Sequence, residues 1–364
     1  MNATGSKARS GTDFQGNCLP VLIGSLPLKD HRQATELILR STPEIPLWPQ
    51  LPSLEGEDML AQFVRGMPGL VSREGKEFID TESPDFDAQL LAFYERYMEV
   101  LENGPGAEDR VFGLDLERSA GFFRFMDILL ERDLPLSAVK GQITGPITFG
   151  TGVKDQEGRA IFYSDQLRDA AVKLLAFKAA WQADRLARFQ VPVLIFFDEP
   201  ALAGFGSSEF ISISKQDVIA SLEEVMEPAR SRQALVGVHV CANADWSVIL
   251  ESNPDILSFD AFAYFEKLVM YAQELRSFVD RGGIIAWGIV PTQDAAIIEE
   301  ETPDSLVKKL QGQFNQLVDM GVDSKQLVAQ SLITPSCGTG SLSVEHAERV
   351  LFLNQEVSRK MRAD

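Results

Sequence analysis

The sequence VPVLIFFDEPAL covers residues 191–202. Its run of aliphatic and aromatic residues is typical of a strand that is buried on both faces, as strands of parallel sheets are. The polar pair Asp198-Glu199 marks the end of this strand. Residues 165–189, which precede it, have the periodicity of an amphipathic helix. A helix that leads into a buried strand is part of a βα repeat, and the same unit recurs along the chain.

Eight segments are predicted to be strands of such repeats, and helical stretches follow the last six. The predicted strands are 19–25, 44–48, 136–144, 191–198, 234–240, 255–260, 283–290 and 326–333. The clearest helices are 165–189, 215–230, 265–280, 303–320 and 344–362, with Ser164 and Ser343 as two of the N-caps. Eight strands with covering helices predict a (β/α)8 TIM barrel, an α/β fold. A doubly wound parallel sheet is the alternative, because counting strands does not decide closure.

A long insertion separates the second and third predicted strands. It contains helical patterns over 86–103 and 118–132 and a predicted hairpin around 69–79. We expect this inserted helical and hairpin segment to project over one mouth of the barrel, where it would act as a lid. Composition does not change along the chain in a way that marks a second domain. The expected organisation is a flexible N-terminus over 1–18 and a single barrel domain over 19–364.

Composition restricts the class of partner. The 34 Lys and Arg residues face 53 Asp and Glu residues, which gives a net charge of −19 over the 364 residues. This charge repels phosphate backbones and anionic membranes, so nucleic acid and membrane partners are disfavoured. The first seventeen residues lack the apolar run of a secretory signal, and a cytoplasmic protein is expected. The three cysteines form no disulfide framework and are free thiols or metal ligands.

A candidate metal site follows from the polar residues at the strand ends, where barrel enzymes build their active sites. His239 and Cys241 are two residues apart on an extended segment, so both side chains point to the same side. Cys337 follows the eighth predicted strand. Two cysteines and one histidine with an open fourth position are a known ligand set for catalytic zinc. The alternative is a buried thiol and a buried imidazole with structural roles only.

Three further positions are candidate site residues. Asp260 could be a fourth metal ligand or a partner of the His239 ring, or it could cap the following helix. Asp198 and Glu199 could bind a substrate ammonium group or transfer protons, or they could cap a loop. Gly24 allows close approach of the backbone, and the Ser25 hydroxyl could bind a carboxylate.

Several motifs together resemble a known superfamily. They are IGSLP from Ile23, KGQITGPITFG from Lys140, DEPAL from Asp198, HVC from His239 and PSCG from Pro335. The chain resembles the uroporphyrinogen decarboxylases and cobalamin-independent methionine synthases over about residues 19–355. The His-x-Cys motif, together with a cysteine near the end of the chain, resembles the motif of the zinc-dependent methyltransferase branch. In that branch, zinc binds a substrate thiol and a methyl group is transferred to the sulfur.

The resemblance implies roles for individual residues. His239, Cys241 and Cys337 would be zinc ligands, and Asp260 falls at the position of the fourth ligand of methionine synthases, a glutamate. Gly24 and Ser25 would bind an amino-acid carboxylate, and Asp198 would bind its amino group.

The chain also departs from the methionine synthases. The catalytic histidine of that family would fall near Val290, where this chain reads GIVPT. The second, folate-associated barrel of full-length methionine synthases would not fit in a chain of this length. Shorter members of the branch often take methyl groups from corrinoids. The resemblance therefore implies a zinc-dependent transfer of a methyl group to a small thiol, with methylcobalamin or a corrinoid protein as donor.

Two other functions are compatible with the sequence. One is a metal-free decarboxylase of the porphyrinogen type, in which Cys241 and Cys337 would have no role. The other is a non-catalytic zinc-binding or corrinoid-binding partner in a methyl-transfer assembly. The zinc content of the protein separates the first of these from a methyltransferase.

Overall fold

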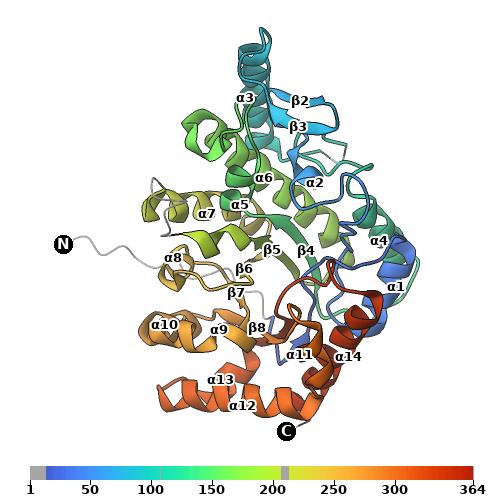
Figure 1. The fold of residues 1–364 in the computed structure, drawn as a ribbon, viewed down its shortest axis with the longest axis vertical. Coiled ribbons are helices and arrows are strands. Elements are labelled where there is room, and N and C mark those ends of the chain that lie inside the picture. The colour runs from blue at the N-terminus through green and yellow to red at the C-terminus, as the bar shows by residue number, and fades with distance from the viewer. Residues whose placement is uncertain (1–13, 107, 206–212, 364) are drawn as a thin grey trace, which may run out of the picture.

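The computed structural model describes residues 14–106, 108–205 and 213–363. Seven strands form one curled parallel sheet in the order β1-β9-β8-β7-β6-β5-β4, with helices around it (Figure 1). The strands are β1 (Leu19–Pro20), β4 (Val139–Thr144), β5 (Val193–Asp198), β6 (Leu235–Val240), β7 (Ile256–Phe259), β8 (Ile284–Val290) and β9 (Ser331–Pro335). The predicted α/β class and the predicted parallel pairing are confirmed.

The segment at 44–48, predicted to be the second strand, is not a regular strand. It contains Pro46, and Pro49 follows, and proline has no N–H group to donate to a ladder. Isolated parallel bridges pair Leu47 with Lys140 of β4 and Gln50 with Ser25, which follows β1. Residues 44–50 therefore lie between the two edge strands of the sheet without completing a continuous ladder.

Two other strand predictions are wrong in extent. The strand predicted over 19–25 pairs regularly only at Leu19–Pro20. The strand predicted over 326–333 begins only at Ser331, because residues 324–329 form a helix. The Asp323 side chain caps that helix by accepting a hydrogen bond from the Gln326 N–H group at 2.8 Å.

The helices alternate with the strands as expected. They are α1 (His31–Ser41), α2 (Ala61–Val64), α3 (Phe86–Asn103), α4 (Ala120–Leu130), α5 (Pro146–Gly152), α6 (Asp165–Leu186), α7 (Lys215–Arg230), α8 (Trp246–Glu251), α9 (Ala261–Leu268), α10 (Ala272–Asp280), α11 (Ala295–Glu300), α12 (Pro303–Asp319), α13 (Ser324–Ala329) and α14 (Val344–Met361). Ser164 and Ser343 are N-caps as predicted. The helix predicted over 265–280 is instead two helices, α9 and α10, separated by the 3-10 turn Val269–Tyr271.

The core has two layers because successive side chains of a strand point to opposite faces. On β5, Leu194 and Phe196 belong to the smaller cluster inside the curled sheet. Ile195 and Phe197 belong to the larger cluster between the sheet and the helices. This alternation assigns each strand residue to the interior or to the helix layer, and it places the polar strand ends at the mouth of the interior.

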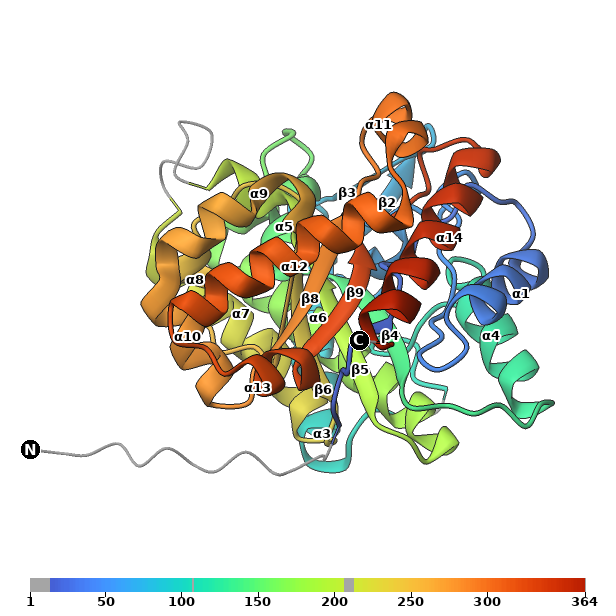
Figure 2. The same ribbon diagram turned by 90° about the horizontal axis from the view of Figure 1, so that it is seen from below.

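The segment between residues 50 and 139 contains the predicted hairpin and helices. Strands β2 (Leu70–Arg73) and β3 (Lys76–Ile79) are antiparallel, and Glu74 and Gly75 of the turn have φ values of 52° and 75°, as in a type I′ turn. Ile79 bridges to Asp155, which follows α5. In Figure 2, the arrows of β8 and β9 point toward the side on which α11 and the hairpin lie. The lid function of this segment stays a prediction.

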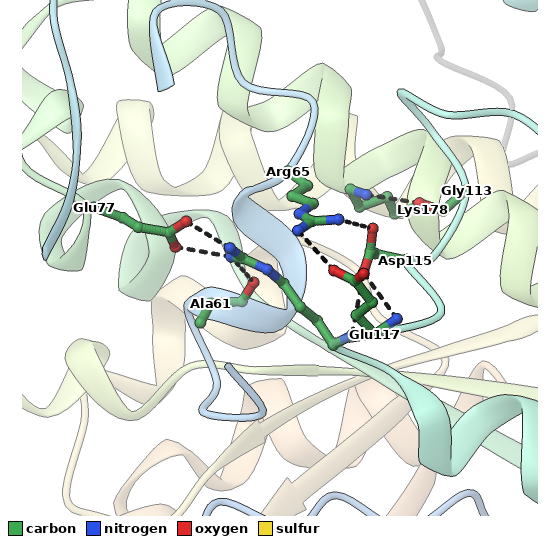
Figure 3. A network of polar contacts seen from close by, with 8 residues as sticks. Ala61, Arg65, Glu77, Gly113, Asp115, Glu117 and Lys178 are labelled. Carbon is green, nitrogen blue, oxygen red and sulfur yellow. Dashed lines mark hydrogen bonds and ion pairs between the residues drawn. The ribbon is translucent and has the colours of Figure 1, made fainter. Parts of the chain in front are cut away.

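Ion pairs hold this segment together, and a hydrogen bond connects it to α6 (Figure 3). Arg65 forms ion pairs with Asp115 and Glu117, and Arg118 pairs with Glu77. The buried Lys178 of α6 donates a hydrogen bond to the Gly113 carbonyl oxygen at 2.7 Å. The outer face of α6 is therefore covered by protein, which explains why this helix is buried on most sides.

The flexibility expected for the N-terminus stays a prediction. Residues 1–13 of the predicted flexible N-terminus lie outside the described residues. Asn17 and Cys18 donate backbone hydrogen bonds to the carbonyl oxygens of Ala329 and Ser331, so the chain is anchored from that point. Among the described residues, no helix has the length and apolar character needed to cross a bilayer.

Candidate metal centre

The three predicted ligands lie together at the carboxyl end of the sheet. His239 is in β6, Cys241 follows that strand directly, and Cys337 follows β9 by two residues. One donor atom from each of the three residues lies within 4.8 Å of the donors of the other two. His239 is buried and both cysteines are half-buried, so the donors sit at the mouth of the sheet interior. The fold thus joins residues that are far apart in the sequence.

The His239 ring is oriented by its neighbour on the next strand. Its Nδ1 atom lies 2.9 Å from the Ser258 hydroxyl oxygen of β7. Its Nε2 atom is buried and has no hydrogen-bond partner among the described residues. Buried polar atoms are nearly always paired, so an orphan imidazole nitrogen beside two thiols points to a missing ligand. A histidine held at one nitrogen and open at the other is typical of metal sites.

Cys241 and Cys337 shift each other's pKa in opposite directions. A hydrogen bond from Cys337, followed by contacts with His239, lowers the pKa of Cys241 to about 4. The same hydrogen bond raises the pKa of the Cys337 thiol far above its usual range. Cys241 is therefore the more acidic of the two thiols. Thiolate sulfur is the form that binds soft metals.

Asp260 serves as a helix cap. It is the N-cap of α9, and its Oδ1 atom accepts a hydrogen bond from the Ala263 N–H group at 2.8 Å. Burial raises the pKa of Asp260 to about 6, and the charges of Cys241 and His239 also influence it. It is not among the three residues whose donors cluster, and the hydrogen-bond partner of His239 is Ser258. The capping contact is present, and a role of Asp260 as a fourth metal ligand stays a prediction.

Asp260→Ala is expected to lower the free energy of unfolding by about 1 kcal/mol through loss of the cap. It should also weaken metal affinity by about 10-fold, because a charge near the ligands is removed. Denaturant unfolding and competition with a zinc chelator measure the two effects. The matched control is Asp323→Ala, which removes the cap of α13. If the Asp260 variant binds zinc as tightly as the Asp323 variant, Asp260 has only its capping function.

Sequence reasoning did not single out Ser258. The signal was present, since Ser258 and Asp260 are two residues apart in DILSFD and so point to the same side. Ser258 is also the register partner of His239 in the β6–β7 pairing. A short hydroxyl on the strand reaches the ring, whereas the carboxylate two residues later is used by the backbone of α9.

Glu199 supports α5. Its two carboxylate oxygens accept hydrogen bonds from the N–H groups of Ile147 and Thr148, each at 2.8 Å, and one of them also accepts from the Thr148 hydroxyl at 2.7 Å. Burial raises the pKa of Glu199 to about 7, against the effect of these donors. The capping alternative therefore holds for Glu199, and its predicted substrate contact is not seen among these bonds.

Asp198 remains available to a ligand. It is the register partner of His239 on β6 and of Thr144 on β4. Its Oδ1 atom is buried and has no hydrogen-bond partner in the described part of the chain. Burial raises the pKa of Asp198 to about 6, while the charges of His239 and Lys140 act in the opposite direction.

Gly24 and Ser25 lie against the loop that contains Cys337. The Ser25 carbonyl oxygen accepts hydrogen bonds from the N–H group of Thr339 at 2.9 Å and from its hydroxyl at 3.0 Å. The Ser25 hydroxyl accepts one from the Gly340 N–H group at 3.2 Å. A side chain at Gly338 would place its Cβ 2.1 Å from the Ser25 hydroxyl oxygen. The predicted carboxylate-binding segment and the loop of the predicted ligand Cys337 therefore pack against each other.

The region after β8 contains no histidine, as the sequence indicated. Thr292 lies 2.9 Å from Ser336 through their hydroxyl oxygens, and Gln293 donates a hydrogen bond to the Cys241 carbonyl oxygen at 3.3 Å. The other two histidines belong to helices, His31 beside Glu57 and His346 beside Glu299. No imidazole other than His239 is part of the cluster.

No family model matches the chain, and no curated protein sequence matches it. A B12-independent methionine synthase from Shewanella sp. W3-18-1, solved with selenomethionine, matches with a TM-score of 0.42 and 20% identity over 61% of this chain and 62% of that chain. A methyltransferase from Methanosarcina mazei matches with a TM-score of 0.49 and 13% identity over 93% and 94% of the two chains.

The tandem GH20 catalytic modules of the pneumococcal exo-beta-D-N-acetylglucosaminidase StrH match with a TM-score of 0.44 and 9% identity over 94% and 85%. Because all three likenesses concern the chain path alone, function has to come from the site. Fold and site define an α/β protein with a curled parallel sheet and a His-Cys-Cys cluster at its carboxyl end.

Proposed function

We propose that the protein is a zinc-dependent methyltransferase that moves a methyl group to a small thiol, within the methionine synthase and uroporphyrinogen decarboxylase superfamily. The observation that carries this proposal is the buried, unpartnered Nε2 atom of His239 beside the thiols of Cys241 and Cys337. We further propose that residues 19–364 form one closed (β/α)8 barrel, in which residues 44–50 complete the ring between β1 and β4.

The donor set fits zinc. Two thiolates and one neutral imidazole are a known catalytic zinc ligation with one position left for the substrate. Zinc bound there would lower the pKa of a substrate thiol and hold it as thiolate at neutral pH. The chain's own contribution is to keep His239 Nδ1 at Ser258, so that Nε2 faces the thiols.

The substrate groups beyond the sulfur would be bound by the surrounding polar residues. The unpaired carboxylate oxygen of Asp198 suits a cationic group of the substrate. The backbone at Gly24 and the hydroxyl of Ser25, next to the Cys337 loop, suit a carboxylate. A thiol that also has an amino group and a carboxylate would contact both Asp198 and the Gly24-Ser25 segment. A thiol without an amino group would contact only the Gly24-Ser25 segment.

A methylcorrinoid is the proposed methyl donor. A folate donor leaves as a nitrogen anion and needs a general acid to supply a proton, whereas transfer from cobalt does not. The residues at 291–293, where methionine synthases have their catalytic histidine, are Pro, Thr and Gln. None of these side chains is an acid that can deliver a proton at neutral pH.

The test combines metal content with turnover. The purified protein is expected to contain about one zinc per chain and to demethylate methylcobalamin in the presence of a thiol. The visible spectrum of the cobalt follows the reaction, with homocysteine and thiols without an amino group as acceptors. Turnover with methyl-folate alone would contradict the donor assignment, and turnover without zinc would contradict the mechanism. Metal-free protein that decarboxylates a porphyrinogen would indicate the decarboxylase function. Zinc or corrinoid binding without turnover would indicate a binding partner.

A further inference from the structure

Two lysines are almost completely buried, Lys140 at 0% and Lys178 at 1% exposure. Burying an ammonium group costs free energy unless its hydrogens are bonded, so each position needs a physical reason. The reason for Lys178 is its hydrogen bond from α6 to the Gly113 carbonyl oxygen, close to the charges of Asp115 and Asp109 (Figure 3). Lys140 lies in a different place, on β4, and contacts none of these groups.

Lys140 points into the interior of the curled sheet. A side chain at the next residue, Gly141, would meet Gln182 of α6, so position 141 faces the helices and position 140 faces inward. The Lys140 ammonium group lies 4.5 Å from the ring centre of Phe196, an interior residue of β5. Burial lowers the pKa of Lys140 to about 8, and the Asp198 charge opposes that effect. The ammonium group is therefore buried in the interior of the curled sheet, beside Phe196.

The hydrogen bonds of Lys140 cross the irregular part of the sheet. Its Nζ atom donates to the Ile23 carbonyl oxygen at 2.6 Å and to the Gln142 side-chain oxygen at 3.3 Å. Gln142 in turn donates to the Trp48 carbonyl oxygen at 2.8 Å. Ile23 follows β1 and Trp48 lies in the segment that has only isolated bridges. Side chains of β4 thus hold two segments that a regular ladder would otherwise hold.

The Ile23 contact is connected to the loop of Cys337 through the next two residues. Gly24 and Ser25 follow Ile23, and Ser25 is hydrogen-bonded to Thr339 and Gly340 in the loop that begins at Cys337. A Cβ at Gly24 would lie 2.6 Å from the Gln50 side-chain oxygen, so the backbone at Gly24 is packed closely against Gln50. A displacement of Ile23 would be transmitted to Gly24 and Ser25.

We infer that Lys140 is a positioning residue that fixes the backbone at Ile23 and thereby the Gly24-Ser25 segment that receives the tail of the thiol substrate. This inference rests on the proposed function. The two parts of the substrate would then be bound by different residues. The metal ligands would bind the sulfur, and the segment that Lys140 positions would bind the tail, which is the polar part of the thiol beyond its sulfur. A thiol with a polar tail should therefore respond to a change at Lys140, whereas a plain alkanethiol should not.

The test measures thiol binding without turnover. Cobalt(II) is loaded into the protein in place of zinc, and the absorption that appears when a thiol joins the metal gives the Kd of homocysteine and of ethanethiol. Lys140→Met is expected to weaken homocysteine binding by about 10-fold, equivalent to about 1.4 kcal/mol. The ethanethiol Kd and the cobalt content should stay as in the wild type. The matched control, Lys178→Met, removes the other buried ammonium and should change neither Kd.

Each other outcome has a distinct meaning. An unchanged homocysteine Kd in Lys140→Met, or an equal loss for both thiols, overturns the inference and leaves the proposed function standing. Lys140→Gln is the second variant, because its shorter amide cannot reach the Ile23 carbonyl, and it should show the same selective loss. If both Lys140 variants fail to fold while Lys178→Met folds, Lys140 is a folding residue and the inference is wrong. Wild-type protein that takes up no cobalt overturns the proposed function as well.

Discussion

Cys337→Ser is expected to lose most of its zinc and to reduce methyl transfer by at least about 100-fold, since even the outer partners of metal ligands are worth 10- to 100-fold. A serine hydroxyl stays protonated at neutral pH and is a poor ligand for a metal that prefers thiolate. The loss should be larger than for Asp260→Ala, because Cys337 supplies one of the three clustered donors and Asp260 does not. Elemental analysis of the dialysed protein measures the zinc directly.

Cys18→Ser is the control for this experiment. Cys18 is fully buried and its Sγ atom lies 3.9 Å from the Val328 carbonyl oxygen, near the start of β1 and away from the mouth of the sheet interior. Cys18 is not one of the three clustered donors, so the folded variant should keep the zinc content of the wild type. Equal zinc content in the Cys337 and Cys18 variants would remove Cys337 from the site and with it the proposed ligand set.

Glu199→Ala is expected to destabilise the fold by about 1–3 kcal/mol, the cost of leaving buried hydrogen-bond donors without an acceptor. The variant leaves the N–H groups of Ile147 and Thr148 without their acceptor at the start of α5. Gly145 supports the same contact, because a Cβ there would lie 2.3 Å from the Glu199 carboxylate. Denaturant unfolding measures the change, and zinc content at low temperature should remain that of the wild type.

The control is Glu223→Ala on the exposed face of α7, which should change the free energy of unfolding by less than about 0.5 kcal/mol. A small loss in Glu199→Ala together with lost turnover and retained zinc would contradict the structural role. In that case Glu199 would act on the substrate, as the sequence alone allowed.

The sequence was sufficient for regular elements whose signals are local. Helix α3 and helix α7 begin and end where the periodicity predicted them, and β4 to β8 lie within the predicted strands. The predictions that failed depended on competition between local structures. Residues 324–329 form a helix that Asp323 caps. Residues 44–48 form no ladder because Pro46, and Pro49 directly after the segment, have no N–H group to donate.

The residue types and spacings of the candidate site were also visible in the sequence. His239 and Cys241 point to the same side because the strand period is two, and Cys337 was placed near them by the predicted strand order. The sequence could not decide between a ligand and a cap for Asp260 or Glu199. Either carboxylate can satisfy backbone N–H groups or a substrate, and only the position of the neighbouring helix start decides which.

By itself, then, the sequence determined the βα alternation, the parallel sheet and the three soft donors, because these follow from periodicity and residue chemistry. Tertiary structure alone decided that the His239 ring is held by Ser258 with Nε2 open, and that Glu199 supports α5. It also decided that the buried Lys140 reaches across the sheet interior to Ile23. These are contacts between residues far apart in the chain, and their geometry depends on how strands and helices pack, which no local pattern encodes.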